Sequence, residues 1–221
     1  MHLELLVEDL SGKKMLESLL PRLVGPEDSF RIHSYKGIGH IPRNMRDTED
    51  ANKRILLDNL PKLLKGYGRT FSQFGPGYRA AVILVCDLDD RALESFLREL
   101  QEILDRCVPA PEARFTLAIE EGEAWLLGDL NAVKIAYPSA REDVLNSYVN
   151  DSICNTWETL ANAVYQGGER ALKAKGWQAV GVEKSRWAEN ISPRLDIEAN
   201  QSPSFQYFRS TVMSLLQREA E

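Results

Sequence analysis

Four short apolar runs in the first half of the chain have the pattern of β-strands, and helical patterns separate them. The runs cover residues 3–7, 30–34, 80–86 and 114–119. The third run is continuous and rich in β-branched residues, which is typical of a strand buried on both faces. Amphipathic stretches with apolar side chains at helical spacing cover residues 13–23, 49–65 and 91–107. This alternation predicts an α/β fold with a mostly parallel sheet and helices on both faces.

The remainder of the chain has helical patterns without strands. We predict helices at residues 132–137, 141–148, 156–174 and 204–219, the last with Ser202 as its cap and Pro203 at its first position. Residues 66–78 contain five glycines or prolines and predict a loop. The expected organisation is an α/β core at residues 1–128 and a mostly helical C-terminal extension at residues 129–221, packed on that core.

Charge and cysteine content narrow the class of protein. The 221-residue chain has a formal net charge of −6, so a generally basic nucleic-acid-binding face is not expected. Its three cysteines have no paired spacing, which favours a reducing compartment. No apolar stretch approaches the roughly 20 residues of a membrane span. We therefore expect a soluble cytoplasmic protein that binds nucleic acid only weakly by itself.

Acidic residues follow three of the four predicted strands. They are Glu8 and Asp9, then Asp87, Asp89 and Asp90, then Glu120, Glu121 and Glu123. Parallel strands bring their carboxyl ends to one edge of a sheet, where ligands bind in open α/β folds. Carboxylate oxygens are preferred ligands of hard divalent ions, so these acids predict a site for one or two Mg²⁺ or Mn²⁺ ions.

The spacing within the second group, Asp87, Asp89 and Asp90, suggests which of these acids can bind the same ion. Alternate residues of an extended segment face the same way, so Asp87 and Asp89 are expected to share an ion while Asp90 points elsewhere. The structural alternative is that these acids are helix caps or first-turn residues. In that case Asp89 or Asp90 caps the helix at residues 91–107, just as Ser11 is expected to cap the first helix.

Two of these segments resemble the Toprim domain of topoisomerases, primases and nucleases of the overcoming-lysogenisation-defect type. Residues 5–8, Leu-Leu-Val-Glu, lead into a helix, and a later strand ends in Asp87-Leu88-Asp89. The resemblance implies that Glu8, Asp87 and Asp89 hold the metal. Toprim domains usually place glycine after the first glutamate, whereas this chain has Asp9.

A longer match points to a bacterial Toprim-like domain family of unknown function. Residues 118–129, with the run Glu-Gly-Glu-Ala-Trp-Leu-Leu, resemble its acidic block, and residues 191–197 and 202–205 resemble its C-terminal part. On that match Glu120 or Glu121, Glu123 and Asp129 are family-typical acids, and Glu120 with Glu123 would complete a second metal position. The resemblance also implies a place in bacterial defence beside a partner ATPase of the AAA or ABC type.

Several cationic residues are candidate partners for a phosphate group. Lys184, or alternatively Arg194, is a candidate to stabilise developing negative charge. Lys13 with Lys14, and His40 with Arg43, are further candidates, with solvent-facing side chains as the structural alternative.

The leading hypothesis is a Mg²⁺- or Mn²⁺-dependent phosphodiester hydrolase, a nuclease acting on DNA or RNA. Two alternatives stay open: a non-catalytic Toprim-fold binding subunit, and a phosphatase-like enzyme of phosphoryl transfer. A homo-oligomer is compatible with each of these three hypotheses. The chain has neither a P-loop nor a nucleophile-elbow motif, which argues against a P-loop ATPase and a serine hydrolase.

Overall fold

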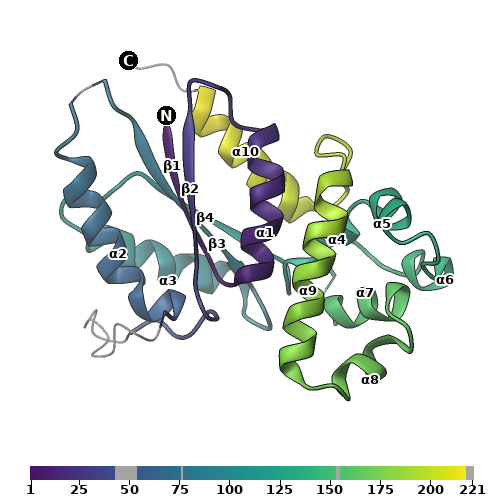
Figure 1. Ribbon diagram of the computed structural model, residues 1–221. Helices are drawn as coiled ribbons and strands as arrows, with labels where there is room; N and C mark the ends of the chain where they lie inside the picture. Colours follow the sequence, from purple (N-terminus) through teal and green to yellow (C-terminus); the bar gives the residue numbers. More distant parts are fainter. Residues whose placement is uncertain (43–53, 76, 153–154, 218–221) are drawn as a thin grey trace.

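A four-stranded parallel sheet forms the centre of the protein. The computed structural model describes residues 1–42, 54–75, 77–152 and 155–217. The strands are β1 (His2–Val7), β2 (Ser29–Ser34), β3 (Ala80–Asp87) and β4 (Ala113–Ala118), in the spatial order β2-β1-β3-β4 (Figure 1). All neighbouring pairs are parallel, and Val7 lies opposite both Ser34 and Val85. The strands therefore end at the same edge, as the α/β prediction requires.

Helices cover both faces of this sheet (Figure 1). On one face lie α2 (Leu56–Phe71) and α3 (Leu93–Asp105). On the other lie α1 (Leu10–Leu19), α9 (Trp177–Ile191) and α10 (Pro203–Gln217). Shorter elements complete the chain: η1 (Leu20–Arg22), α4 (Glu123–Leu127), α5 (Leu130–Ala136), α6 (Glu142–Leu145), α7 (Thr156–Val164), α8 (Gly168–Lys173) and η2 (Ser192–Arg194). The predicted fold class, with its helical C-terminal part, is confirmed.

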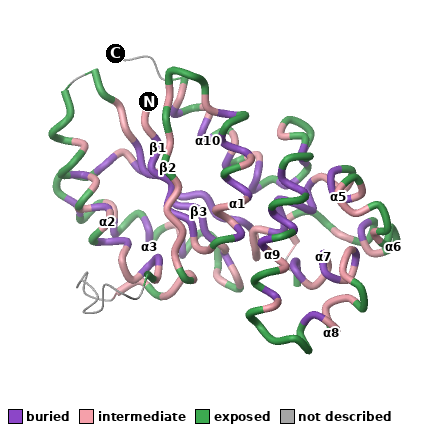
Figure 2. Tube along the Cα trace, viewed as in Figure 1, coloured by how far each residue is buried: buried purple, intermediate pink, exposed green. Residues whose placement is uncertain are grey.

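The sheet separates two hydrophobic cores. In β1, Leu3 and Leu5 join the core beneath α1, α9 and α10, whereas Leu6 joins the core beneath α2 and α3. This division follows from the alternation of side chains along a strand. Figure 2 shows the buried segments running along the strands and the inner sides of the helices.

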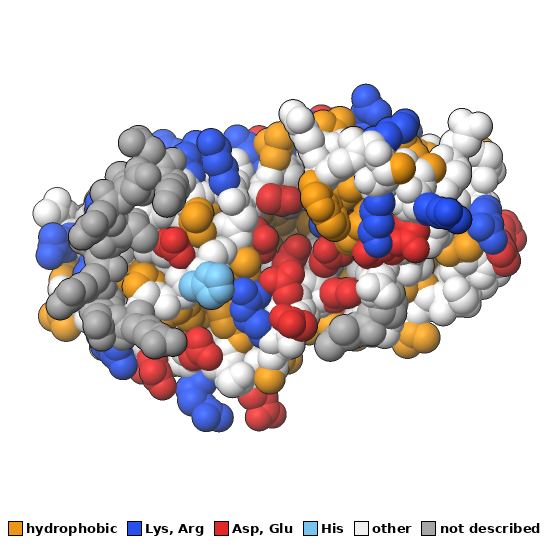
Figure 3. Space-filling model, turned by 90° about the horizontal axis from the view of Figure 1, so that it is seen from below, with side chains coloured by type: hydrophobic (Ala, Val, Ile, Leu, Met, Phe, Trp, Pro, Cys, Tyr) orange, Lys and Arg blue, Asp and Glu red, His pale blue; other side chains and the backbone are white. Residues whose placement is uncertain are grey.

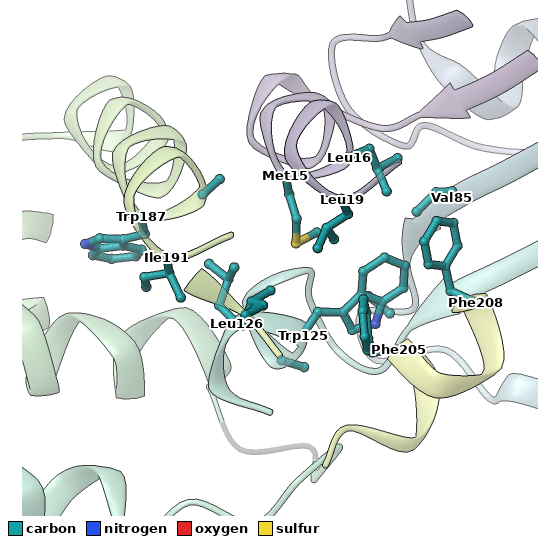
Figure 4. Close-up of a cluster of buried hydrophobic side chains, with 14 of the residues drawn as sticks. Met15, Leu16, Leu19, Val85, Trp125, Leu126, Trp187, Ile191, Phe205 and Phe208 are labelled. Atoms are coloured by element: carbon teal, nitrogen blue, oxygen red, sulfur yellow. The ribbon is translucent and has the colours of Figure 1, made fainter. Parts of the chain in front are cut away.

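An aromatic cluster fixes the C-terminal part on the core. The buried indole of Trp125 stacks on Phe208 and meets Phe205 edge-on, at ring-centroid distances of 4.9 and 5.7 Å (Figure 4). Its Nε1–H also donates a hydrogen bond to Ser204 Oγ at 2.9 Å. Buried aromatic pairs of this kind add roughly 0.5–1.5 kcal/mol beyond area burial. Helix α4, which carries Trp125 and Glu123, is therefore held by α10.

Helix ends differ from the predictions where short polar residues compete for the capping position. Asp9, rather than Ser11, caps α1, since its Oδ1 accepts the Gly12 N–H at 2.8 Å. Neither Asp89 nor Asp90 caps α3, whose N-cap is Ala92 without a side-chain bond. Ser202 Oγ accepts the Phe205 N–H at 3.2 Å, and Pro203 is the first residue of α10 as predicted.

Three helical segments also differ in extent. Helix α2 continues to Phe71, through residues predicted as a loop, while residues 49–53 lie outside the described residues. The helix predicted at 156–174 is divided in two at Gly167 and Gly168, which both have positive φ. Helix α9 was not predicted at all. Among the described residues, no helix is both long and apolar enough to cross a bilayer.

Candidate metal centre at the strand ends

Acidic side chains from three strand ends meet at the carboxyl edge of the sheet. Oε2 of Glu8, directly after β1, accepts a hydrogen bond from the backbone N–H of Asp87 at 3.1 Å. Seen from below, this face of the molecule gathers acidic side chains near its middle (Figure 3). We call the group formed by Glu8, Asp9, Asp87, Glu121 and Glu123 the acidic edge. The predicted convergence of strand-end acids is observed for these residues.

A small cavity lies within the acidic edge. Its volume is about 30 Å³, and Glu8, Asp9, Asp87 and Glu123 contribute to its lining. Apolar side chains, including Met15, close its inner side. A space of this size holds a water molecule or an ion, not a nucleotide. Any larger substrate must therefore approach from the surface.

Asp9 lines the cavity and also accepts a backbone hydrogen bond from the start of α1. Its φ of −143° is extended, so glycine is not required at this position. Both carboxylate oxygens are used, because Oδ1 accepts the Gly12 N–H and Oδ2 accepts the Ser11 hydroxyl at 2.7 Å. Asp9 thus secures the turn from β1 into α1.

One lysine from a distant helix faces the acidic edge. Lys184 Nζ, on α9, lies 3.0 Å from Glu123 Oε2 and 3.5 Å from Glu121 Oε1. Glu123 is only 3% exposed and the side chain of Lys184 is 15% exposed. A partly buried ammonium thus lies between two carboxylates. Lys184, one of the cationic candidates from the sequence, therefore lies next to the acidic edge.

The surroundings favour protonation of these acids. Burial raises the pKa of Glu8 to about 7, although the Asp87 N–H opposes the shift, and burial raises that of Glu121 to about 7 despite Lys184. The pKa values of Asp87 and Glu123 are raised by burial as well. Burial lowers the pKa of Lys184, but Glu123 and Glu121 outweigh it and raise that pKa well above its usual value. The acidic edge has more carboxylates than its one lysine neutralises.

Asp89 departs from the expected arrangement. Its φ of 50° is left-handed, so the extended run ends before this residue and Asp89 no longer alternates with Asp87. Its Oδ2 pairs with Arg91 at 2.7 Å. The expectation that Asp87 and Asp89 face the same way is not met, although the charge of Asp89 still raises the pKa of Glu8. Asp90 is exposed to solvent.

Glu120 is directed to a helix start. Its carboxylate accepts the backbone N–H groups of Asn155 and Thr156 at 2.9 and 2.8 Å, and the hydroxyl of Thr156. These bonds satisfy donors at the N-terminus of α7, where an acid is also favoured by the helix dipole. Of the two residues that the sequence left open, Glu121 contacts Lys184 at the acidic edge and also accepts the Trp157 N–H at 3.1 Å. Glu120 instead bonds to the start of α7.

The remaining predicted residues lie apart from the acidic edge. Lys14 pairs with Glu189 at 2.6 Å, and Arg194 donates to the Asn190 carbonyl. Asp129 caps α5 by accepting the Ala132 N–H at 3.0 Å. Lys13 pairs with Glu17 at 3.6 Å. His40 is exposed on the loop after β2; Arg43 lies outside the described residues.

The residues of the acidic edge fit a hard divalent ion in chemistry and in charge. Their donors are carboxylate oxygens, which suit Mg²⁺ and Mn²⁺. No described residue forms an ion pair with Glu8 or Asp87, although both line the ion-sized cavity. In the described part of the chain, no three Asp, Glu, His or Cys side chains are already arranged to hold one ion. Metal binding here therefore requires side-chain rotation toward the cavity.

Comparisons of the chain with models of known families, with curated proteins and with solved structures find no match. The geometry of the acidic edge is therefore the main ground for assigning a function.

Proposed function

We propose that the protein is a Mg²⁺- or Mn²⁺-dependent phosphodiester hydrolase, a nuclease, with its centre at the acidic edge. The observation that carries this proposal is the ion-sized cavity lined by Glu8, Asp9, Asp87 and Glu123, with Glu8 bonded to the Asp87 backbone. The resemblance of Glu8 and Asp87-Leu88-Asp89 to the Toprim pattern supports it from an independent direction. The same resemblance is the ground for proposing a cytoplasmic defence role with an ATPase partner.

The proposed ligands are Glu8 and Asp87, with Asp89 as a third if it leaves Arg91. A bound divalent ion supplies Lewis-acid polarisation of a phosphoryl oxygen and lowers the pKa of a bound water. The Glu8–Asp87 N–H bond orients the Glu8 carboxylate, so one oxygen is fixed and the other is available. Because the cavity excludes a nucleotide, the scissile phosphate would rest at its mouth.

Lys184 and Glu121 complete the proposed machinery. The Lys184 ammonium, held by Glu123, supplies a fixed positive charge near the position where a phosphate would gain negative charge. Glu121 would help to position this ammonium, because its Oε1 lies 3.5 Å from Lys184 Nζ while its Oε2 accepts the Trp157 N–H at 3.1 Å. Glu123 would act by positioning Lys184.

Cleavage of defined substrates tests the proposal. Supercoiled plasmid, single-stranded DNA, RNA and a nucleotide monophosphate are incubated with the protein and Mn²⁺, or with EDTA. We expect Mn²⁺-dependent cleavage of a polynucleotide, reduced at least about 100-fold in Asp87→Ala and unchanged in the control Asp90→Ala. Equal cleavage by Asp87→Ala and wild type would show that the site is wrong, and turnover of the nucleotide alone would favour the phosphatase alternative.

One observation favours a second candidate, a non-catalytic binding subunit. Lys184 already pairs with Glu121 and Glu123, so two of the five residues of the acidic edge have a counter-ion without a metal. Calorimetry with Mn²⁺ separates the two candidates. Binding that disappears in Asp87→Asn supports the hydrolase, whereas no heat of binding at millimolar Mn²⁺ supports the subunit.

A further inference from the structure

A second concave surface lies along α2, and its charged residues are basic, unlike those of the acidic edge. It has a volume of about 740 Å³. Its charged lining residues are Arg54, Lys62, Lys65 and Arg69, and no carboxylate contributes to the lining. Tyr35 and Tyr67 are the aromatic members. We call this surface the basic groove; it stands out on a chain whose formal net charge is −6.

In the part of the chain that the structure describes, no acid pairs with the cations of the basic groove. Within the described residues, none of Arg54, Lys62, Lys65 and Arg69 forms an ion pair. Arg54 donates to the Ser34 carbonyl at 2.9 Å and lies over the Tyr35 ring at 5.9 Å. The one carboxylate of α2, Asp58, does not line the groove, because it accepts the His40 N–H at 3.0 Å. The groove is thus a concentrated positive surface.

The spacing of the cations along α2 is regular. Lys62, Lys65 and Arg69 lie at positions i, i+3 and i+7, which places them on one face of the helix. Seven residues of helix span about 10 Å. One strand of a duplex carries about three phosphates over that length, since each strand has one per about 3.4 Å. The helix therefore offers one cation for each of about three successive phosphates.

The basic groove begins at the same edge of the sheet as the carboxylates. The Gly37 N–H donates to the Glu8 carbonyl at 3.1 Å, and the neighbouring Lys36 N–H donates to the Arg54 carbonyl at 2.6 Å. Helix α2 then runs away from that edge. These backbone bonds connect the start of the groove to the residue that carries the Glu8 carboxylate.

We infer that the basic groove binds the sugar–phosphate backbone of a nucleic-acid strand and leads it to the acidic edge. The inference rests on the proposed function and extends it, because it gives the chain its own binding site for the nucleic-acid substrate. Both tyrosines pack against the core, Tyr35 beneath Arg54 and Tyr67 beside Phe71, so the charge of the four cations is the ground for binding. The even spacing of the cations along α2 fits the regular phosphates of a nucleic-acid strand better than an acidic peptide.

Binding without metal tests the inference separately from cleavage. A fluorescein-labelled 15-nucleotide oligothymidylate is titrated with protein in EDTA, with anisotropy as the readout, from 50 to 200 mM salt. Each single-strand phosphate contact contributes about −0.7 to the slope of log affinity against log salt. Four contacts predict a slope near −3, which is a roughly 50-fold loss over that range.

Charge-matched variants locate the binding. We expect the triple variant Lys62→Gln, Lys65→Gln, Arg69→Gln to lose about tenfold or more in affinity at 50 mM salt and to lower the slope by about 2. The control triple Arg141→Gln, Arg170→Gln, Lys175→Gln changes exposed cations in the C-terminal part and should bind as wild type. The single variant Lys62→Gln, at an exposed position, gives a smaller loss that does not depend on the triple variant folding.

Three results would overturn the inference: no metal-free binding by wild type, equal weakening by both triple variants, or equal displacement of the oligonucleotide by polyglutamate. Asp87→Asn should bind the oligonucleotide as wild type does. Binding without cleavage would therefore support the basic groove as a nucleic-acid site and contradict the proposed hydrolase. Cleavage without binding in the groove would support the hydrolase and contradict the groove.

Discussion

The Lys184 ammonium on α9 lies 3.0 Å from Oε2 of Glu123 at the first position of α4. The contact links two helices of the C-terminal half and neutralises an almost fully buried carboxylate. Breaking a buried ion pair costs more than the pair contributes, because the remaining charge loses its counter-ion.

Replacing Lys184 by methionine should therefore destabilise the protein. Lys184→Met keeps the length of the side chain but leaves Glu121 and Glu123 without their common cation. Because Lys184 is 15% exposed, we expect a loss of about 2–3 kcal/mol, below the range for fully buried pairs. Urea unfolding in EDTA measures it. Lys14→Met, which breaks an exposed pair with Glu189, is the control and should cost no more than about 1 kcal/mol.

The role assigned to Glu120 predicts a loss of stability without a loss of metal binding. Glu120→Gln weakens the bonds to Asn155 and Thr156 at the start of α7, so unfolding free energy should fall by about 1–2 kcal/mol. Mn²⁺ affinity by calorimetry should stay within twofold of wild type. A large loss of Mn²⁺ affinity would instead return Glu120 to the metal site. Glu94→Gln, at an exposed position of α3, is the matched control.

The raised pKa values of the acidic edge predict how stability depends on pH. Glu8 and Glu121 have pKa values of about 7 in the folded protein and ordinary values near 4.5 when unfolded, mainly because of burial. Between these values the folded state binds more protons, so unfolding free energy falls as pH rises from about 4.5 to 7. The two groups together predict a fall in EDTA on the order of several kcal/mol.

Denaturation at pH 5, 6, 7 and 8 measures this slope. The variant Glu8→Gln cannot ionise at that position and should give a flatter profile. Because ligands must be deprotonated, Mn²⁺ affinity should rise over the same interval. Stability that increases from pH 5 to 7 in EDTA would contradict the prediction.

A separate buried carboxylate, Glu4, predicts loss of stability at lower pH. Its oxygens lie 2.6 Å from His33 Nε2 and 3.2 Å from His2 Nε2, and Tyr67 donates at 3.4 Å. Burial alone would raise the pKa of Glu4, but the two histidines outweigh it and lower it. Its stabilising contribution is therefore present above about pH 4.5 and is lost as pH falls through the lowered value.

Substitution at this position isolates that contribution. Glu4→Gln should reduce unfolding free energy at pH 7 by about 1.5–3 kcal/mol, the range for hydrogen bonds to charged groups. It should also remove the corresponding loss below pH 4.5. The exposed Glu27→Gln is the control, and an equal effect of both variants would contradict the assignment.

The strands and the acids that follow them could be predicted from the sequence because both are local patterns. The apolar run before Asp87 identifies β3, and parallel strands bring Glu8 and Asp87 to one edge whatever the loops do. The choice between Glu120 and Glu121 is not local. It depends on where α7 begins, since Glu120 accepts the N–H groups of Asn155 and Thr156.

Helix α9 escaped prediction although it carries Lys184. Its apolar residues Val180, Trp187, Ala188 and Ile191 do have helical spacing, but Gly181 and a largely polar surface weaken the pattern. The backbone conformation at Asp89 escaped prediction for a different reason. An extended segment would alternate Asp87 with Asp89, whereas a left-handed backbone at Asp89, which aspartate tolerates, redirects the side chain to Arg91.

The packing of Trp125 against Phe205 and Phe208 has a consequence for protein synthesis. A nascent chain emerges from the ribosome N-terminus first, so α4 is made well before α10. Until α10 emerges, Trp125 lacks both its aromatic neighbours and the Ser204 hydroxyl, and the helix that carries Glu123 lacks its support. Helix α4, and with it the Glu123 side of the acidic edge, is therefore fully supported only after α10 has been made.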